Sequence, residues 1–214
     1  MSTIVIFGGT GYAGGSIAAE AVSRGHQVIS YSRTAPAQTT AGVEYRTASL
    51  TDDAVLAQAA TEADDLVVAT HGADVGGSPL VDHVERLTSA AIEHGARLSF
   101  VGGAGSLHVA KGGPRLVDTP DFLDDWKPEA LSHAQVLDAL RAGPQELDWF
   151  YVSPAALFGS FAPGETTGSY RLGGDELVTT EDGMSEISGT DFALAYVDEI
   201  EQRRHPRQRF TVAH

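Results

Sequence analysis

The sequence predicts an α/β fold, a doubly wound parallel sheet in three layers with helices on both faces. Short apolar runs alternate along most of the chain with longer segments whose apolar residues recur at helical spacing. The first run, Thr3–Phe7, is rich in β-branched residues and apolar on both faces, as in a strand at the centre of a parallel sheet. Right-handed crossovers between such strands place helices on both faces of one sheet.

The first half of the chain alternates regularly between strands and helices. After the strand at Thr3–Phe7, a helix is expected over Tyr12–Arg24, with Gly25-His26 as its C-cap. A helix at Asp52–Ala60 begins with Asp52 or Thr51 as its N-cap. The other elements expected here are strands at Gln27–Tyr31, Val43–Arg46, Asp65–Ala69 and Arg97–Val101, and a helix at Pro79–His94.

The second half is less regular. A glycine-rich loop is expected over 102–118, a helix at Pro128–Ala142 and a strand at Leu147–Val152. Residues 157–188 are expected to form a small irregular lobe on the substrate side of the sheet. A last amphipathic helix at Thr190–Glu201 and an edge strand at Arg209–Val212 follow. No repeat or linker divides the chain, so residues 1–214 are expected to form a single domain.

The composition excludes several classes of protein. The chain has 14 basic and 29 acidic residues, a net charge of −15, so neither nucleic acid nor an anionic membrane is an expected partner. It has no cysteine, which excludes disulfides, thiolate nucleophiles and iron–sulfur clusters. No apolar run is long enough to span a bilayer or to form a signal peptide. We expect a soluble, cytoplasmic monomer or homodimer that acts on a small molecule.

A glycine turn after the first strand is the strongest functional signal. Gly9, Gly11 and Gly14 spell G-x-G-x-x-G between a predicted strand and a predicted helix, the context that this motif requires. Glycines there allow a tight turn and let the backbone approach a pyrophosphate at the helix N-terminus. The turn therefore predicts a Rossmann-like dinucleotide site. The alternative is a plain strand-to-helix turn whose glycines bind nothing.

The residues after the second strand favour one dinucleotide over the other. NAD sites usually carry an acidic residue there, which binds the ribose hydroxyls. This chain has Ser32 and Arg33 instead, and a guanidinium suits a 2′-phosphate. We therefore expect NADP(H) to be preferred over NAD(H). The alternative is that Arg33 is a solvated loop charge.

Several motifs together resemble a known family. They are the run Ile6-Phe7-Gly8-Gly9-Thr10-Gly11-Tyr12-Ala13-Gly14, the loop Val101–Leu107, the triplet Ser153-Pro154-Ala155, and the segments Leu116–Pro120 and Tyr170–Asp175. Over essentially its whole length the chain resembles the atypical short-chain dehydrogenase/reductases. Within them it is most similar to the NAD(P)H-binding subgroup named for NADH–flavin reductases, relatives of biliverdin/flavin reductase and of NmrA-like proteins.

The resemblance implies a set of cofactor-binding positions. Where the family commonly has an aspartate before the adenine pocket, this chain has Ser49. The positions implied are the pyrophosphate turn (Gly8, Thr10, Gly11, Tyr12, Ala13, Gly14), the adenine pocket (Leu50, Thr51), the ribose side (Thr70, His71, Gly72), and the nicotinamide side (Gly102, Gly103, Ser153, Pro154, Ala155).

One departure from the superfamily bears on the reaction. Reductases of alcohols and ketones use Tyr-x-x-x-Lys to move a proton. The chain has only Lys111 and Lys127, and Leu107 and Leu123 stand four residues before them. Hydride transfer to a flavin needs mainly the alignment of two rings. We therefore expect an NADPH-dependent reductase whose electron acceptor is a flavin or a similar flat molecule. The flavin would be a substrate and not a bound prosthetic group. The alternative is a non-catalytic, NmrA-like redox sensor.

The remaining candidates are single side chains. His133 shares a helix face with Leu137 and Leu140, so it is expected to point toward the sheet. There it is either a catalytic or ribose-binding group, or a buried histidine whose hydrogen bonds are satisfied within the chain. Ser106 matches the superfamily's catalytic serine in position only, because it lacks an activating base. No metal site is expected. Four aromatic residues have two possible roles: they line the site of a flat substrate, or they pack the loops. They are Trp126, Phe158, Phe161 and Tyr170.

Overall fold

The computed structural model describes residues 1–214 and has an eight-stranded sheet at its centre. The strands are β1 (Thr3–Phe7), β2 (Gln27–Ser32), β3 (Val43–Thr47), β4 (Asp65–Val68), β5 (Arg97–Val101), β6 (Trp149–Ser153), β7 (Arg171–Gly173) and β8 (Gln208–Ala213). Their order in the sheet is β3-β2-β1-β4-β5-β6-β8-β7. All neighbours are parallel except β7, which runs antiparallel to β8.

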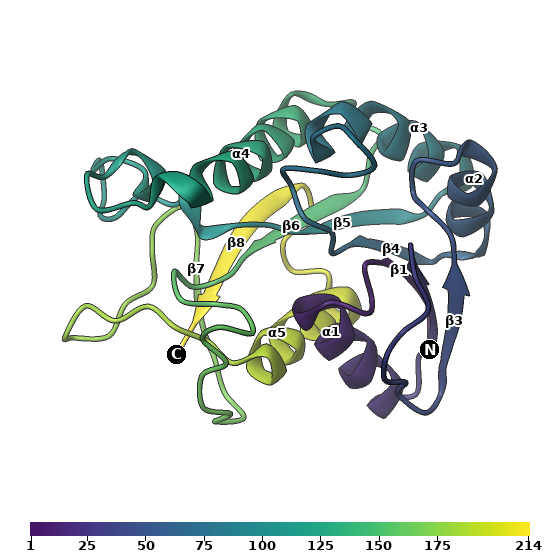
Figure 1. Ribbon diagram of the computed structural model, residues 1–214, viewed down its shortest axis with the longest axis horizontal. Coiled ribbons are helices and arrows are strands. Elements are labelled where there is room, and N and C mark those ends of the chain that lie inside the picture. The colour runs from purple at the N-terminus through teal and green to yellow at the C-terminus, as the bar shows by residue number, and fades with distance from the viewer.

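Five α-helices cover the two faces of the sheet. They are α1 (Tyr12–Ser23), α2 (Asp53–Glu62), α3 (Val84–His94), α4 (Lys127–Ala142) and α5 (Gly189–Gln202). Helices α2, α3 and α4 lie on one face, and α1 and α5 pack together on the other (Figure 1). The Rossmann-like, three-layer fold predicted from the alternation of strands and helices is therefore confirmed.

The helix ends follow local sequence signals. Asp52 caps α2, since its carboxylate accepts hydrogen bonds from the amides of Ala54 and Val55. Gly25 follows α1 with a φ of +85°, and Gly95 caps α3 with a φ of +72°. Both adopt the left-handed conformation in which glycine commonly ends a helix.

Each face of the sheet has its own hydrophobic core. One core joins the sheet to α2, α3 and α4, with Leu66, Phe100 and Trp149 among its fully buried side chains. The other joins it to α1 and α5 and includes Ile6 and Phe192. Because both faces of the central strands are buried, their side chains cannot alternate with polar residues, as the apolar runs predicted.

The lobe side of the sheet differs from the prediction in one respect. The prediction that Arg209–Val212 is an edge strand is wrong, because β8 lies between β6 and β7. The three residues of β7 come from the irregular segment 157–188 and pair Leu172 with Val212. Such a short, long-range pairing has no periodic signal in the sequence.

The expected helix over Pro79–His94 begins differently from the prediction. A 3₁₀ turn at Leu80–His83 precedes α3.

None of the helices is both long and apolar enough to span a membrane.

Candidate functional site

The glycine turn lies at the point of the sheet where the order of the strands reverses. Strand β1 leads into it, and β2 and β4 flank β1 on either side. In open α/β sheets this switch point is where the carboxyl ends of the strands leave a crevice for a ligand. Gly8 has a φ of +90°, and a Cβ there would lie 2.4 Å from the carbonyl oxygen of Ala69, just after β4. Only glycine allows the turn to pass this close to the neighbouring strand.

The first turn of α1 offers unpaired backbone donors. Gly11 is its N-cap and supplies no side-chain acceptor. The amides of Tyr12, Ala13 and Gly14 donate no hydrogen bond within the chain. A helix N-terminus with free amides and a partial positive charge is suited to a phosphate group.

The glycines of the turn have different structural roles. A Cβ on Gly14 would lie 2.3 Å from the carbonyl oxygen of Gly8, so Gly14 keeps the turn closed. A Cβ on Gly11 would meet only that same oxygen, at 3.3 Å, and is otherwise free of contacts. Gly11 therefore keeps open a space that the chain itself does not fill.

The loop after β4 carries an unsatisfied hydroxyl. Thr70 Oγ1 is buried and has no hydrogen-bond partner. Thr51, from the predicted adenine pocket, packs near Gly76 of the same loop, where a Cβ would lie 3.0 Å from Thr51 Cγ2. Buried hydroxyls are normally paired, so the Thr70 hydroxyl, together with the free amides of α1, fits a bound dinucleotide.

Helix α4 holds the β4 loop in place through three side chains. Glu129 accepts hydrogen bonds from the amides of Gly72, at 2.7 Å, and of Ala73, at 2.8 Å. Ser132 donates to the carbonyl oxygen of Gly72 at 2.6 Å. His133 lies directly beneath Gly72, whose Cβ would be 2.8 Å from His133 Cδ2.

His133 is therefore buried and already engaged. It is 5% exposed, and its Nε2 donates to Glu129 Oε1 at 3.1 Å. Its Nδ1 is buried without a partner. Burial favours a higher pKa for Glu129, but the hydrogen bonds from His133, Gly72 and Ala73 outweigh it and lower the pKa to about 2. This clamp keeps a carboxylate charged beside the predicted ribose site.

Sequence reasoning missed Glu129. The available signal was its position four residues before His133, which places both side chains on one face of α4. His71, which was predicted to line the site, has a side chain that is 86% exposed and lies 3.6 Å from Glu129.

The residues of the nicotinamide side predicted from the resemblance lie at the ends of β5 and β6. Gly102 packs against the ring of Tyr151, which a Cβ would approach to 2.1 Å, and Gly103 faces His133. Ala155 is 2% exposed, and its amide donates no hydrogen bond within the chain. A buried amide requires a partner, and the carboxamide of a nicotinamide would supply one. The Ser153 carbonyl is already bound by Thr211 Oγ1 at 2.9 Å.

The end of β2 presents one unpaired cation. Arg33 is exposed and forms no ion pair or side-chain hydrogen bond, whereas Ser32 donates to the carbonyl oxygen of Thr34. The other arginine of this region, Arg46, is bound to Glu44 and Glu62. Arg33 is thus free to bind an anion.

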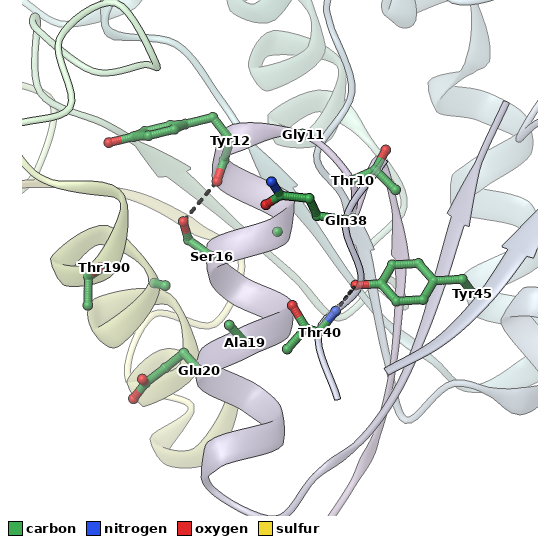
Figure 2. A pocket seen from close by; sticks show the side chains of 13 residues that line it. Thr10, Gly11, Tyr12, Ser16, Ala19, Glu20, Gln38, Thr40, Tyr45 and Thr190 are labelled. Carbon is green, nitrogen blue, oxygen red and sulfur yellow. Dashed lines mark hydrogen bonds between the residues drawn. The ribbon is translucent and has the colours of Figure 1, made fainter. Parts of the chain in front are cut away.

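An open pocket of about 460 Å³ adjoins the glycine turn along the outer side of α1 (Figure 2). Gln38 and Thr40, from the β2–β3 connection, face α1 across it, and Tyr45 holds this connection by accepting a hydrogen bond from the Thr40 amide. The pocket contains Gly9–Tyr12 but none of the residues at the ends of β4, β5 and β6. It therefore adjoins the predicted phosphate end of the site and not the predicted nicotinamide end.

The side chain of Tyr12 does not face the predicted cofactor. Its hydroxyl accepts a hydrogen bond from the Gly189 amide at 2.8 Å and donates to the carbonyl oxygen of Pro163 at 3.0 Å. Its ring packs edge-on against Phe158. Tyr12 therefore contributes its backbone to the turn and its side chain to the attachment of the lobe.

Comparison with known proteins shows the family to which the chain belongs. The NAD(P)H-binding family matches residues 8–203 of the chain. YwnB of Bacillus subtilis, an uncharacterised protein, is 35% identical over an alignment of 214 positions that covers 98% of this chain and 97% of YwnB.

Two crystal structures are similar over the full length of both chains. A provisionally named exported protein from Burkholderia pseudomallei is 41% identical with a TM-score of 0.82 and 100% coverage of each chain. A provisionally named NADH-flavin reductase from Streptococcus pneumoniae is 32% identical with a TM-score of 0.79 and the same coverage of 100%. This chain belongs to the NAD(P)H-binding protein family, with the fold of an atypical short-chain dehydrogenase/reductase.

Proposed function

We propose that the protein is an NADPH-dependent reductase that transfers a hydride to a flavin or a similar flat electron acceptor. The observation that carries the proposal is the state of His133. This histidine packs against Gly72 and Gly103, and it is buried and hydrogen-bonded to Glu129. A group held in this way is poorly placed to donate a proton to a substrate.

The lysines support the same conclusion. Lys127 binds Asp124 at 2.7 Å at the start of α4, and neither it nor Lys111 has a tyrosine four residues before it. Reduction of a ketone requires a proton donor at the carbonyl oxygen. A flavin accepts a hydride into a conjugated ring that tolerates the added charge, so that the protein need only align the two rings.

An exposed aromatic pair stands at the start of the helix that clamps the site. Trp126 is the N-cap of α4, is 44% exposed, and lies 5.5 Å, centroid to centroid, from Phe161 of the lobe, which is 65% exposed. Exposed aromatic rings of this size offer a flat ligand a stacking surface. The pair supports an acceptor that is planar.

The preference for NADPH rests on Arg33, which is free to bind a 2′-phosphate. The chain also has no acidic residue among the first residues after β2 that would bind an unmodified ribose. The name of the Streptococcus pneumoniae relative supports the flavin, but it mentions NADH. The cytoplasmic location and the monomeric or homodimeric state remain predictions from the sequence.

Steady-state oxidation of NADPH, followed by the loss of its absorbance with and without added FMN, tests this function. We expect FMN-dependent oxidation that saturates with both compounds and is absent from Gly11→Val, a variant expected to fold without binding the cofactor. If the wild type binds NADPH but oxidises it no faster with FMN or a quinone, the proposal is wrong and a non-catalytic sensor of the NmrA type takes its place.

A further inference from the structure

One side chain joins the glycine turn to the lobe, and the function proposed above makes no use of it. Tyr12 is the first residue of α1, and its backbone amide is one of the free donors at the predicted phosphate position. Its hydroxyl reaches the lobe, where it donates to the carbonyl oxygen of Pro163 at 3.0 Å, and it also accepts from the amide of Gly189 at 2.8 Å. A single residue therefore contributes to both the cofactor turn and the attachment of the lobe.

The part of the lobe beside the site depends on this hydroxyl. Residues 158–163, which we call the lobe turn, are closed by a hydrogen bond from the Ala162 amide to the carbonyl oxygen of Gly159 at 3.0 Å. The bond from the Tyr12 hydroxyl is the only hydrogen bond between the lobe turn and the remainder of the chain. The Tyr12 ring also packs edge-on against Phe158, with 5.3 Å between the ring centroids. Tyr12 is thus the polar anchor of the lobe turn.

The other end of the lobe turn reaches the start of α4. Phe161 contacts Trp126, with 5.5 Å between the ring centroids. No hydrogen bond or ion pair joins the lobe turn to residues 107–126, so this contact rests on the two rings alone. The same two rings form the stacking surface proposed above for a planar acceptor. A movement of the lobe turn would therefore alter the wall of the acceptor site.

A bound dinucleotide would restrain this connection from the cofactor end. The amides of Tyr12, Ala13 and Gly14 have no partner within the chain, and a pyrophosphate that accepts hydrogen bonds from them would fix the backbone of the first turn of α1. A tyrosine side chain has only two rotatable bonds, so the Tyr12 hydroxyl follows its backbone closely. Ordering of the glycine turn would therefore be passed on to Pro163 and to the lobe turn.

We propose that Tyr12 is a positioning residue whose hydroxyl couples occupancy of the glycine turn to the wall of the acceptor site. The bound dinucleotide orders the lobe turn against Trp126, and the acceptor binds to a surface that is already ordered. A ligand that binds to an ordered surface loses less conformational entropy and binds more tightly. This inference rests on the proposed binding of NADP(H) at the turn, and it adds a coupling between the two ligands of the proposed reaction.

The fluorescence of Trp126 reports on this coupling. The chain has two tryptophans, of which Trp149 is 1% exposed and Trp126 is 44% exposed, so acrylamide quenches mainly Trp126. The probe is 2′-phospho-ADP-ribose, which is NADP⁺ without its nicotinamide ring and cannot place that ring at the ends of β5 and β6. We expect saturation with this probe to lower the quenching constant of the wild type by about 1.5- to 3-fold, because the lobe turn is then ordered against Trp126.

Tyr12→Phe tests the role of the hydroxyl, because it keeps the ring and every backbone amide. We expect this variant to bind the probe within about threefold of the wild-type affinity, as measured by calorimetry, while its quenching no longer responds to the probe. The matched control is Tyr170→Phe. It also removes a tyrosine hydroxyl that joins the lobe to α5, in this case at Asp198, but it does not touch the glycine turn. We expect its quenching to respond as in the wild type.

Steady-state kinetics extends the test to the reaction. In Tyr12→Phe we expect the KM for FMN to rise about 3- to 10-fold, with smaller changes in kcat and in the Kd for NADPH, since the hydroxyl acts on the acceptor site alone. In Tyr170→Phe all three should remain within about twofold of the wild type. A merely structural role of tyrosine hydroxyls in the lobe would affect the two variants alike.

Failure of the coupling and failure of the proposed function give different results. If the wild type does not bind the probe, both the proposed cofactor and the inference are wrong. Binding without a change in the quenching of Trp126 would overturn the inference alone. So would a response that persists in Tyr12→Phe, or one that is lost equally in Tyr170→Phe. If the wild type shows the coupling but reduces no flavin, the reductase function is wrong and the role of Tyr12 stands.

Discussion

Arg33 is the residue on which the proposed preference for NADP(H) rests. It is exposed and unpaired, and therefore loses no partner when it binds a phosphate. A charge-assisted hydrogen bond to such a group contributes about 1.5–3 kcal/mol. We expect the wild type to bind NADP⁺ more tightly than NAD⁺, and Arg33→Ala to lose this preference while its affinity for NAD⁺ is unchanged. Calorimetric titration with both cofactors measures this, and equal affinities in the wild type would refute the assignment.

Gly11 separates cofactor binding from folding. Because a Cβ on Gly11 meets only the Gly8 carbonyl, at 3.3 Å, we expect Gly11→Val to fold with a circular dichroism spectrum like that of the wild type. Its side chain would occupy the space that the pyrophosphate requires, so binding of NADP⁺ should be abolished. The contrasting variant is Gly14→Ala, whose Cβ would lie 2.3 Å from the same oxygen and should destabilise the turn itself. Unchanged affinity in folded Gly11→Val would mean that the turn is only structural.

His133 is expected to position the site and not to transfer a proton. Its ring lies under Gly72 with Nε2 bound to Glu129, so its loss should loosen the β4 loop. For His133→Ala we expect a KM for NADPH that rises more than kcat falls, with kcat reduced by less than the roughly 10²- to 10⁴-fold typical of a lost general acid. Steady-state kinetics as a function of pH would show this. A thousandfold lower kcat at an unchanged KM, on the order expected for a lost acid, would make His133 catalytic.

Helix α4 shows how one element organises the site. Glu129, Ser132 and His133 all bind or support the loop after β4, and Trp126 stands at the start of the same helix. The pKa of Glu129 is about 2 in the folded chain and 4.5 ordinarily. Its carboxylate therefore stabilises the fold fully above pH 4.5, and this contribution is lost as the pH falls toward about 2.

Glu129→Gln tests this contribution of α4. The neutral amide leaves a backbone donor without an acceptor, so we expect the free energy of unfolding at neutral pH to fall by about 1–3 kcal/mol. The difference between wild type and Glu129→Gln should shrink as the pH falls from 4.5 toward about 2, because the carboxyl group of the unfolded wild type then binds a proton that the folded state excludes. Urea denaturation at several pH values measures both effects. A difference that is constant with pH would show that the charge on Glu129 contributes nothing.

Elements with local signals were predictable from the sequence, and elements that depend on distant partners were not. The apolar runs of β1, β4 and β5, the N-cap at Asp52 and the glycine that ends α1, Gly25, are properties of neighbouring residues. The structure has them at or near the predicted bounds. The pairing of β7 with β8 depends on where the lobe folds back, which three residues cannot encode locally.

The same distinction applies to the site. The glycine turn has a motif because its spacing is dictated by one local backbone path. Glu129 has none, since its role depends on the β4 loop, 56 residues away in the sequence. At the scale of the whole molecule, Tyr12 connects these regions, because it ties the cofactor turn both to the lobe at Pro163 and to α5 at Gly189.

The proposed function requires two ligands to meet at the carboxyl ends of β4, β5 and β6. The most direct test is a single turnover under anaerobic conditions, in which the protein is loaded with one equivalent of NADPH and mixed with FMN. We expect the absorbance of oxidised flavin and that of reduced nicotinamide to fall together, in equal molar amounts, and much faster than in Gly11→Val. Binding of NADPH with no faster loss of oxidised flavin than in the absence of protein would contradict the reductase function.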